Sequence, residues 1–440
     1  MCKILILDPK PNRQYRISKD TSGGYGTAND FGDTFFTKIL KNRLKKIHDW
    51  PPMYVGYIFS ILQKKGYTVN YSTTENLISN NYDFVILVSS IVCFETEINI
   101  LKNIKKKYNN IKVFVIGPFA TNNKEKYLLN NGIVISGEPE FFFLKENNFN
   151  NYNDGTVIEI KNDISLDELP FPSWNKIIQN LKASTLFGDQ KTLPILATRG
   201  CPYSCFKYCV YPLQQGRQVR HRSSKNIVDE LEYWKNKLNV NSFIFRDPVF
   251  SINKKHTLEV CEEIINRNLK IQFIIETHLR ILDENLIENL KKAGLIGVKV
   301  GIESSNLEVL KDANRYTVTK DTQIEKVKFL ERNNIKVSAM YIIGYPEDTE
   351  KTIMETLKYS IKLNTAFAQF AVWTPYPGTP VFKEYEEKII TNKFEDFTQY
   401  QLVFKHKNLS PKDVRKLLSK CYEKYYLRYN WIIKKILLKD

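Results

Sequence analysis

The sequence lacks the long apolar run that a membrane span requires. A transmembrane helix needs about 18 to 20 consecutive apolar residues, and no stretch of the 440-residue chain approaches that length. The apolar start at residues 1–7 is broken by Asp8 and Lys10, which is not the pattern of a signal peptide. We therefore expect a cytoplasmic protein without a membrane span.

Cysteine is scarce, which excludes a disulfide framework as the basis of the fold. The chain has seven cysteines, an odd number, and four of them are scattered as single residues that we interpret as reduced thiols. These four are Cys2, Cys93, Cys261 and Cys421. The other three, Cys201, Cys205 and Cys209, fall within nine residues, a grouping that indicates metal or redox chemistry in a cytosolic protein.

The composition is that of a folded globular protein with a basic surplus. Hydrophobic residues make up 42% and charged residues 26% of the chain, and 440 residues predict two domains with an appendage. Lys and Arg number 65 against 48 Asp and Glu, which could indicate nucleic acid, an anionic membrane or phosphorylated substrates. Because lysine is frequent everywhere, we interpret the surplus as solvated faces and do not expect a nucleic-acid partner.

The first 147 residues alternate strand and helix patterns and predict a Rossmann-like α/β domain. Strands are expected at residues 3–7, 67–71, 84–88 and 112–116, and helices at 53–65 and 95–107. Residues 9–52 form a long excursion that contains Ser22-Gly23-Gly24-Tyr25-Gly26, which we interpret as a flexible loop in preference to a phosphate-binding loop. Residues 148–190, rich in Asn, Asp and Pro, are expected to be a linker.

The strand and helix pattern resumes about six times in residues 191–383. Strands are expected at residues 195–198, 242–245, 271–275, 298–302, 337–343 and 368–373. Six strands are too few for a closed eight-stranded barrel and predict a partial (β/α)6 barrel of the TIM type, with its site at the carboxyl ends of the strands. Residues 384–440 are expected to be a helical extension, with Ser410-Pro411 starting a helix over 412–428.

The three clustered cysteines follow a predicted strand in the run Cys201-Pro-Tyr-Ser-Cys205-Phe-Lys-Tyr-Cys209. Three thiolates on one short loop can each bind one iron of a cubane cluster and leave the fourth iron open. A structural zinc ion would need a fourth protein ligand, for which His221 is the nearest candidate. A zinc- or thiol-based binding module without catalysis therefore stays open as an alternative.

Around this loop the chain resembles the radical S-adenosylmethionine (SAM) superfamily, and more narrowly its cobalamin-binding subfamily. The matching elements in the second half are TRGCPY at 198–203, YCVYP at 208–212, RHRS at 220–223, GIES at 301–304, IGYPEDT at 343–349 and TPYPGTP at 374–380. Those elsewhere are residues 51–66, IGP at 116–118, SGEPE at 136–140, DELPFPSW at 167–174 and YYLR at 425–428. The likeness covers nearly the whole chain.

The resemblance implies that the three cysteines hold a [4Fe-4S] cluster whose open iron chelates SAM. An electron from a reductant such as flavodoxin or ferredoxin would then yield a 5'-deoxyadenosyl radical. The residues it places near SAM are Tyr208, with Phe206 in reserve, Asp247, Glu303, Ile343, Gly344 and Glu347. For Asp247 a pairing with Arg246, and for Glu303 a core ion pair, are the structural alternatives. The loop has one residue more between Cys205 and Cys209 than the family usually has.

Two further sets of positions belong to the expected site. Glu276, Thr277 and Arg280, after the third barrel strand, are expected to line a substrate site, with a structural salt bridge as the alternative. Ligands of parallel sheets bind beyond the carboxyl ends of the strands, so cobalamin is expected near Ser89, Ser90, Gly117 and Pro118. The chain lacks the Asp-x-His-x-x-Gly signature, whose histidine would be the lower ligand of the cobalt. His48 is the one histidine in residues 1–140.

These features predict a cobalamin-dependent radical enzyme that methylates an unreactive carbon of a small molecule. A non-methylating radical SAM enzyme, which performs cyclisation, oxidation or rearrangement with a vestigial cobalamin-type domain, is the nearest alternative. An RNA methylthiotransferase is a further one, although that group resembles only the central part of this chain. It carries three additional cluster cysteines upstream, where this chain has only Cys2 and Cys93.

Overall fold

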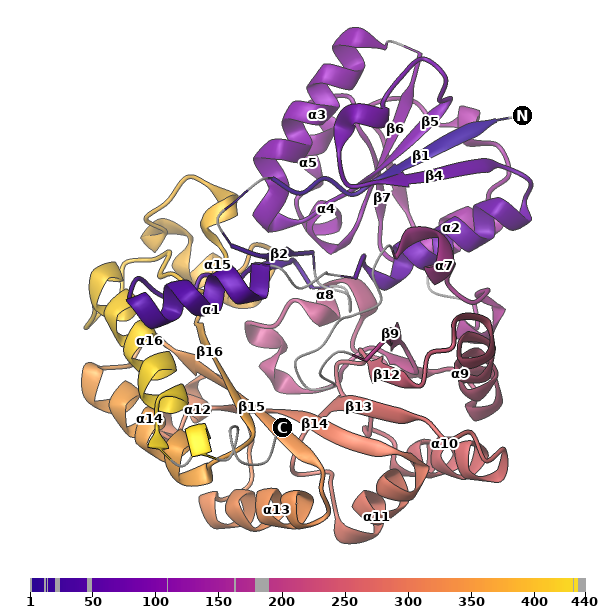
Figure 1. The fold of residues 1–440 in the computed structure, drawn as a ribbon. Helices are drawn as coiled ribbons and strands as arrows, with labels where there is room; N and C mark the ends of the chain where they lie inside the picture. Colours follow the sequence, from indigo (N-terminus) through magenta and orange to yellow (C-terminus); the bar gives the residue numbers. More distant parts are fainter. Residues whose placement is uncertain are drawn as a thin grey trace.

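The fold consists of two α/β units, each built on a parallel sheet (Figure 1). The computed structural model describes residues 2–11, 13, 15–19, 24–45, 50–108, 110–161, 164–178, 190–429 and 431–433. Within these residues each unit has a six-stranded sheet. The predicted α/β class, with a Rossmann-like first unit and a partial barrel as the second, is confirmed.

The first sheet has the strand order β4-β1-β5-β6-β7-β8. Its strands are β1 (Lys3–Leu7), β4 (Thr68–Ser72), β5 (Phe84–Val88), β6 (Lys112–Ile116), β7 (Ile133–Ser136) and β8 (Val157–Glu159). Every residue of β5 is buried, because a parallel sheet is covered on both faces. Ile4 and Ile6 pack with Met53 and Ile58 of α2 on one face, whereas Leu5 packs with the α3 side on the other.

The helices of this unit differ in length and in burial. They are α2 (Met53–Lys64), α3 (Phe94–Lys107), α4 (Pro118–Asn122), α5 (Lys124–Leu128), α6 (Pro139–Lys145) and, after the sheet, α7 (Trp174–Ile177). Because β8 pairs with β7 in parallel, the first sheet continues into the segment that was expected to be a linker. The predicted domain boundaries at 147, 190 and 383 stay predictions.

The second sheet is an arc of six strands in the order β16-β15-β14-β13-β12-β9 (Figure 1). Its strands are β9 (Thr192–Ile195), β12 (Ser242–Phe245), β13 (Gln272–Thr277), β14 (Leu295–Glu303), β15 (Lys336–Ile343) and β16 (Phe367–Val372). The helices outside the arc are α9 (Ser224–Leu238), α10 (Lys254–Asn266), α11 (Glu284–Ala293), α12 (Leu307–Asp312), α13 (Lys320–Arg332) and α14 (Glu350–Leu363).

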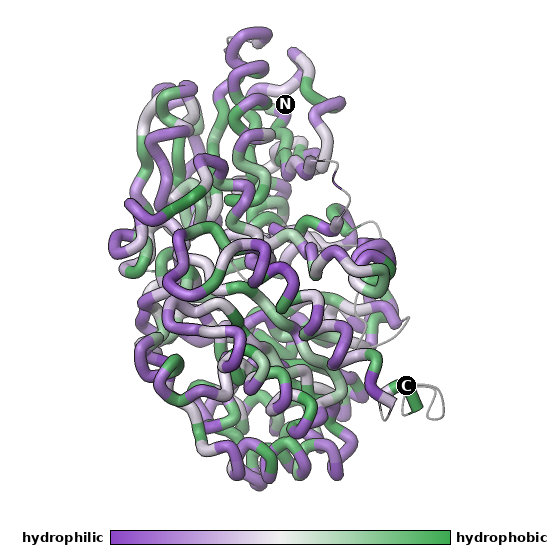
Figure 2. The backbone as a smooth tube through the Cα atoms, turned by 90° about the vertical axis from the view of Figure 1, so that its left-hand side faces the viewer, coloured by the Kyte–Doolittle hydropathy of each residue, from purple (hydrophilic) through white to green (hydrophobic). Residues whose placement is uncertain are grey.

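Side chains of β15, in the second sheet, alternate between two environments. Along β15 every second residue is buried under the helices, and the residues between them are only partly buried. The partly buried set points to the concave face of the sheet, where Trp50 packs against Ile244 and Ile274 at one end. Figure 2 shows that hydrophobic segments run through the interior and that hydrophilic ones lie on outer turns. The carboxyl ends of these strands stay the predicted place for a ligand.

The first barrel strand begins earlier than predicted. Strand β9 ends at Ile195, whereas the sequence predicted residues 195–198. Thr198 and Arg199 instead form β10, which pairs antiparallel with β11 (Arg220–His221). The prediction was wrong because the apolar run continues through Leu196 and Ala197, although the backbone has already left the sheet.

The last helices close the edge of the barrel. They are α15 (Pro380–Tyr385) and α16 (Pro411–Tyr426), and α16 starts at a Ser410 cap as predicted. A short helix much earlier in the chain, α8 (Tyr211–Gln215), lies near the cysteine loop. Tyr422 and Tyr426 of α16 bond backbone groups of Phe370 and Ala368 on edge strand β16. These bonds protect an edge that would otherwise expose unpaired backbone groups. No helix in the described part of the chain is both long and apolar enough to span a membrane.

A segment near the start of the chain joins the two units. We call residues 24–45 the strap; it contains β3 (Thr27–Ala28), which pairs with β2 (Ile17–Ser18), and α1 (Phe35–Lys45). Helix α1 lies beside α16 (Figure 1). Ser22, Gly23 and His48 lie outside the described residues.

Candidate active site

The three clustered cysteines lie together in the loop that follows β10. Cys201 is buried, and Cys205 and Cys209 are partly buried. Burial raises the pKa of all three thiols, and the pKa of Cys209 is raised further by the nearby Cys205 and Cys201. Among the described residues no three His, Cys, Asp or Glu side chains could hold a metal ion. A cubane does not need such a point of convergence, because each thiolate binds a different iron.

The additional residue in the loop is accommodated by one turn of helix. Residues Ser204–Lys207 form a 3-10 helix, and the backbone amides of Tyr208 and Cys209 both donate to the carbonyl of Cys205 at 3.1 Å. Cys205 and Cys209 are four residues apart, a spacing that puts side chains on the same side of a helical turn. The insertion therefore does not separate the two thiols. The side chain of Phe206 lies outside the described structure.

Asp247 holds the backbone that leads into the cysteine loop. Its carboxylate accepts hydrogen bonds from the amides of Ala197, at 3.0 Å, and Thr198, and it is completely buried. Burial raises its pKa to about 7. Arg246, the partner weighed for this residue, pairs with Glu276, and a contact of Asp247 with the amino group of SAM stays a prediction. Asp247 supports the loop that carries the cysteines.

An ion-pair network ties the same loop to the first unit. Arg199 donates from Nη1 to Oε1 of Glu138 at 2.8 Å and also pairs with Glu140, at the start of α6. Arg220 binds the other oxygen of Glu138 at 2.7 Å. The Arg199 guanidinium also lies 5.7 Å from the ring centroid of Tyr57. Glu138 and Glu140 belong to the SGEPE motif, so this motif acts as a buried docking point for the cysteine loop.

Glu303 reaches the cysteines through Arg315. Its Oε1 lies 3.3 Å from Nη2 of Arg315, whose Nη1 is 3.8 Å from the sulfur of Cys205. Glu303 has a left-handed backbone (φ 65°), a conformation that is rare for a residue with a side chain and that often marks a functional site. The core ion pair that was weighed for Glu303 is present, and it lies against the cysteine loop. No sequence signal had identified Arg315.

Of the other residues predicted to contact SAM, some lie near the cysteine loop and one lies on the surface. The ring of Tyr208 packs edge-on against Tyr345 at 6.3 Å, beyond the end of β15, where Ile343 is buried. Gly344 has φ 73°, but a Cβ there would meet only valine carbons at 3.6 Å or more. The left-handed backbone, and not a lack of space, therefore requires glycine at this position. Glu347 is half-exposed and pairs with Lys407 at 2.6 Å, so the expectation that it lies along the adenine is not supported by this geometry.

The expected substrate-lining residues lie in three different environments. Glu276, on the concave face, pairs with Arg246 and, at 3.3 Å, with Lys299. Burial would raise the pKa of Glu276, but Arg246 and Lys299 together lower it. Thr277 is buried against Ser251, and Arg280 is exposed. The salt bridge expected as the alternative for Glu276 is present, on the face where a substrate would bind.

The carboxyl ends of the first sheet are covered by the chain itself. Ser89 accepts from the amide of Ala120 at 3.0 Å, and Ser90 donates to the carbonyl of Tyr25 in the strap at 2.9 Å. A Cβ on Gly117 would lie 2.7 Å from the hydroxyl of Tyr54. Pro118 is buried as well. Neighbouring side chains and the strap cover these four positions, and their role toward cobalamin stays a prediction.

His221, the fourth ligand considered for zinc, packs against another histidine. Its ring centroid is 4.6 Å from that of His256. Burial and His256 lower the pKa of His221. The pairing of β10 with β11 holds His221 opposite Thr198.

Residues 195–360, which span the cysteine loop and the barrel strands β12 to β15, match the model of the radical SAM superfamily. This part of the chain belongs to the radical SAM superfamily. Among curated proteins, this radical SAM chain is 29% identical over 281 residues to an uncharacterised methyltransferase of Pyrococcus horikoshii, covering 63% of this chain and 58% of that protein. It is 26% identical over 387 residues to an anaerobic magnesium-protoporphyrin IX monomethyl ester cyclase of Rubrivivax gelatinosus, covering 79% and 69%.

Two solved structures share the arrangement of both units with this radical SAM chain. One is the radical SAM methyltransferase TsrM of Kitasatospora setae with cobalamin and a [4Fe-4S] cluster bound (TM-score 0.59, 15% identity, 88% of this chain and 78% of that one). The other is the cobalamin-dependent enzyme OxsB with aqua-cobalamin and SAM bound (TM-score 0.60, 14% identity, 97% and 67%). At such identities the likeness shows the fold. The chain spans a little over half of the Pyrococcus protein.

Proposed function

We propose that this radical SAM enzyme binds one [4Fe-4S] cluster through Cys201, Cys205 and Cys209 and removes a hydrogen atom from a small molecule held at the concave face. The observation that carries the proposal is the grouping of three thiols on one pinned loop beside Arg315. The chemistry supplied there is the one-electron cleavage of SAM to methionine and a 5'-deoxyadenosyl radical. The electron would come from a reductant protein such as flavodoxin or ferredoxin.

The residues of the chain hold this chemistry in place and keep water away. Asp247 and Glu138 fix the two sides of the cysteine loop. Tyr208 and Tyr345 pack against each other next to that loop, and aromatic rings there exclude the water that would quench a radical. On the concave face, Glu276 and its two cationic partners offer polar contacts that orient a substrate.

The finer proposal is methylation of the substrate carbon with cobalamin as the methyl donor. It is supported by the methyltransferase relatives and by the cobalamin in the two structural neighbours. The strand ends named in the sequence are covered by side chains and by the strap. The second candidate is a radical reaction without corrinoid, such as cyclisation or rearrangement, because a cyclase is among the relatives.

Anaerobic reconstitution of the full chain tests these proposals in one series. With iron, sulfide and hydroxocobalamin present, we expect about four irons per chain and 5'-deoxyadenosine after addition of SAM and a reductant. Cys201→Ala, Cys205→Ala and Cys209→Ala should each lose both signals, whereas Cys2→Ser should keep them. A wild-type chain without bound iron contradicts the proposal. Bound corrinoid with a methylated product supports methylation, and iron without corrinoid supports the second candidate.

A further inference from the structure

Arg315 is the cationic side chain that contacts a cysteine of the cluster loop. Its Nη1 donates toward the sulfur of Cys205 at 3.8 Å, and its Nη2 donates to the carbonyl of Gly301 at 3.2 Å. The side chain is 12% exposed. It lies in the segment after α12, outside every motif that the sequence provided.

The backbone around Arg315 is fixed from two sides. Ser204, within the cysteine loop, donates to the carbonyl of Asn314 at 3.0 Å. His278, which follows β13, bonds the carbonyl of Tyr316 at 3.0 Å. The position of the guanidinium therefore depends on the loop that it contacts, so a variant side chain would enter a defined environment.

The strand next to Arg315 leaves room for it. A Cβ on Gly301 would lie 2.7 Å from Nη2 of Arg315 and 2.3 Å from Oε1 of Glu303. The register of β14 against β15 shifts between Gly301 and Glu303, which turns the Glu303 carboxylate toward the guanidinium. Nε of Arg315 is buried and has no hydrogen-bond partner among the described residues. Glu303 therefore balances the positive charge of Arg315 but does not use all of its N–H donors.

We propose that Arg315 is a positioning residue that raises the reduction potential of the cluster by holding its positive charge and an N–H donor against the sulfur of Cys205. The inference rests on the proposed function, because it needs a cluster on the three cysteines. One electron enters the cluster on reduction, and no bond to Arg315 forms or breaks. Reduction adds a negative charge to the cluster. A nearby cation and a hydrogen bond to a ligating sulfur therefore stabilise the reduced cluster. Glu303 opposes this effect with its own charge.

The midpoint potential of the reconstituted full chain, titrated without SAM and followed by the electron paramagnetic resonance of the reduced cluster, tests the inference. We expect Arg315→Gln to shift the reduction equilibrium at least tenfold toward the oxidised cluster, about 59 mV for one electron. Arg315→Lys keeps the charge but not the planar donor group, so its shift should be smaller. Because SAM is absent, a role of Arg315 in holding SAM would not contribute.

Two variants separate this role from structural damage. Lys225→Gln removes an exposed cation on α9 that pairs with Asp229, and its potential should equal that of the wild type. Glu303→Gln should shift the potential in the opposite direction. If Arg315→Gln does not take up iron, Glu303→Gln decides alone: a more positive potential supports the inference. Unchanged potentials in fully loaded variants overturn it, whereas a wild-type chain that binds no iron overturns the proposed function itself.

Discussion

At the scale of single residues, Asp247 controls the start of the cysteine loop with a carboxylate that never meets solvent. A carboxyl group in such a place stabilises the fold most while it is neutral. Its folded-state pKa of about 7 lies above the ordinary value of 3.8. Its contribution to the free energy of unfolding is therefore complete at low pH and is lost as the pH rises toward and through 7.

Asp247→Asn should remove this dependence, because the amide stays neutral at every pH. The free energy of unfolding of the apo variant, relative to wild type, should rise by about 2 to 3 kcal/mol between pH 5 and pH 8. Urea unfolding at four pH values within this range measures it. A difference that stays constant with pH would show that burial does not perturb this carboxyl group.

The residues of the site differ in how far the sequence could reveal them. The three cysteines stood out in the sequence because they fall within nine residues. Arg315 did not, since its contact with Cys205 depends on how the segment after α12 folds back onto a loop 110 residues earlier. The motif of Glu347 resembles a cofactor loop, and no local pattern predicted that its side chain would pair with Lys407.

At the scale of elements, helix α6 and the pair β10–β11 form the junction between the two units. Glu138 holds Arg199 and Arg220 at once, and all three side chains are largely buried. Removal of one partner from a buried ion pair leaves a charge without compensation, which is costlier than the loss of a pair at the surface.

Glu138→Gln should therefore lower the free energy of unfolding by about 3 to 5 kcal/mol and reduce the iron content after reconstitution. Glu347→Gln is the matched control, because it breaks an exposed pair worth about 1 kcal/mol or less. Urea titration and iron analysis of both variants measure the effects. Equal losses in the two variants would mean that the junction does not depend on Glu138.

The order of elements was predictable from sequence where apolar runs are long. Strands β5 and β6 were predicted within the observed bounds because their apolar runs are flanked by turn residues. Strands β7 and β8 were missed, since β7 has four residues and β8 is a partly exposed edge strand of three. Short edge strands carry little of the pattern that separates a strand from a loop.

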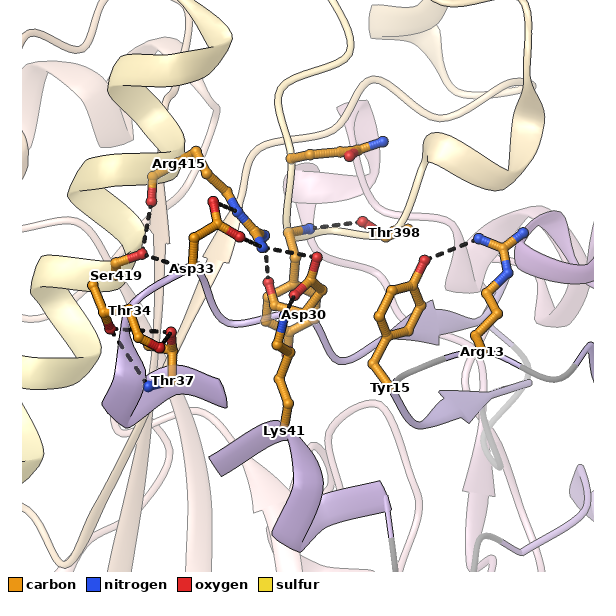
Figure 3. Close-up of polar contacts among 12 residues, drawn as sticks. Arg13, Tyr15, Asp30, Asp33, Thr34, Thr37, Lys41, Thr398, Arg415 and Ser419 are labelled. Carbon is orange, nitrogen blue, oxygen red and sulfur yellow. Dashed lines mark hydrogen bonds and ion pairs between the residues drawn. The ribbon is translucent and has the colours of Figure 1, made fainter. Parts of the chain in front are cut away.

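At the scale of the whole molecule, the strap fastens the beginning of the chain to its end. Arg415 of α16 pairs with Asp33 at 2.6 Å and with Asp30 at 2.9 Å, and it donates to the backbone carbonyl of Asp30 as well (Figure 3). Thr27 donates to the carbonyl of Thr398 at 2.9 Å. The sequence predicted only a long excursion over residues 9–52 here, because no local pattern records a partner almost 400 residues away.

Arg415→Ala should loosen the strap without unfolding either sheet. Charge-assisted hydrogen bonds of this kind contribute about 1.5 to 3 kcal/mol, so the variant should be cut faster by a protease within residues 24–45, while the sheets stay resistant. Lys225→Ala, which breaks an exposed pair with Asp229 on α9, is the control. The same cleavage rate in both variants would contradict a fastening role for Arg415.

The distance along the chain between Asp33 and Arg415 has a consequence in time. The two residues are 382 positions apart, and a ribosome adds about 5 to 20 residues per second. About 20 to 80 seconds therefore pass between the synthesis of Asp33 and the synthesis of Arg415. The cysteine loop is synthesised about halfway through this interval, so the residues around it can fold before the strap meets α16.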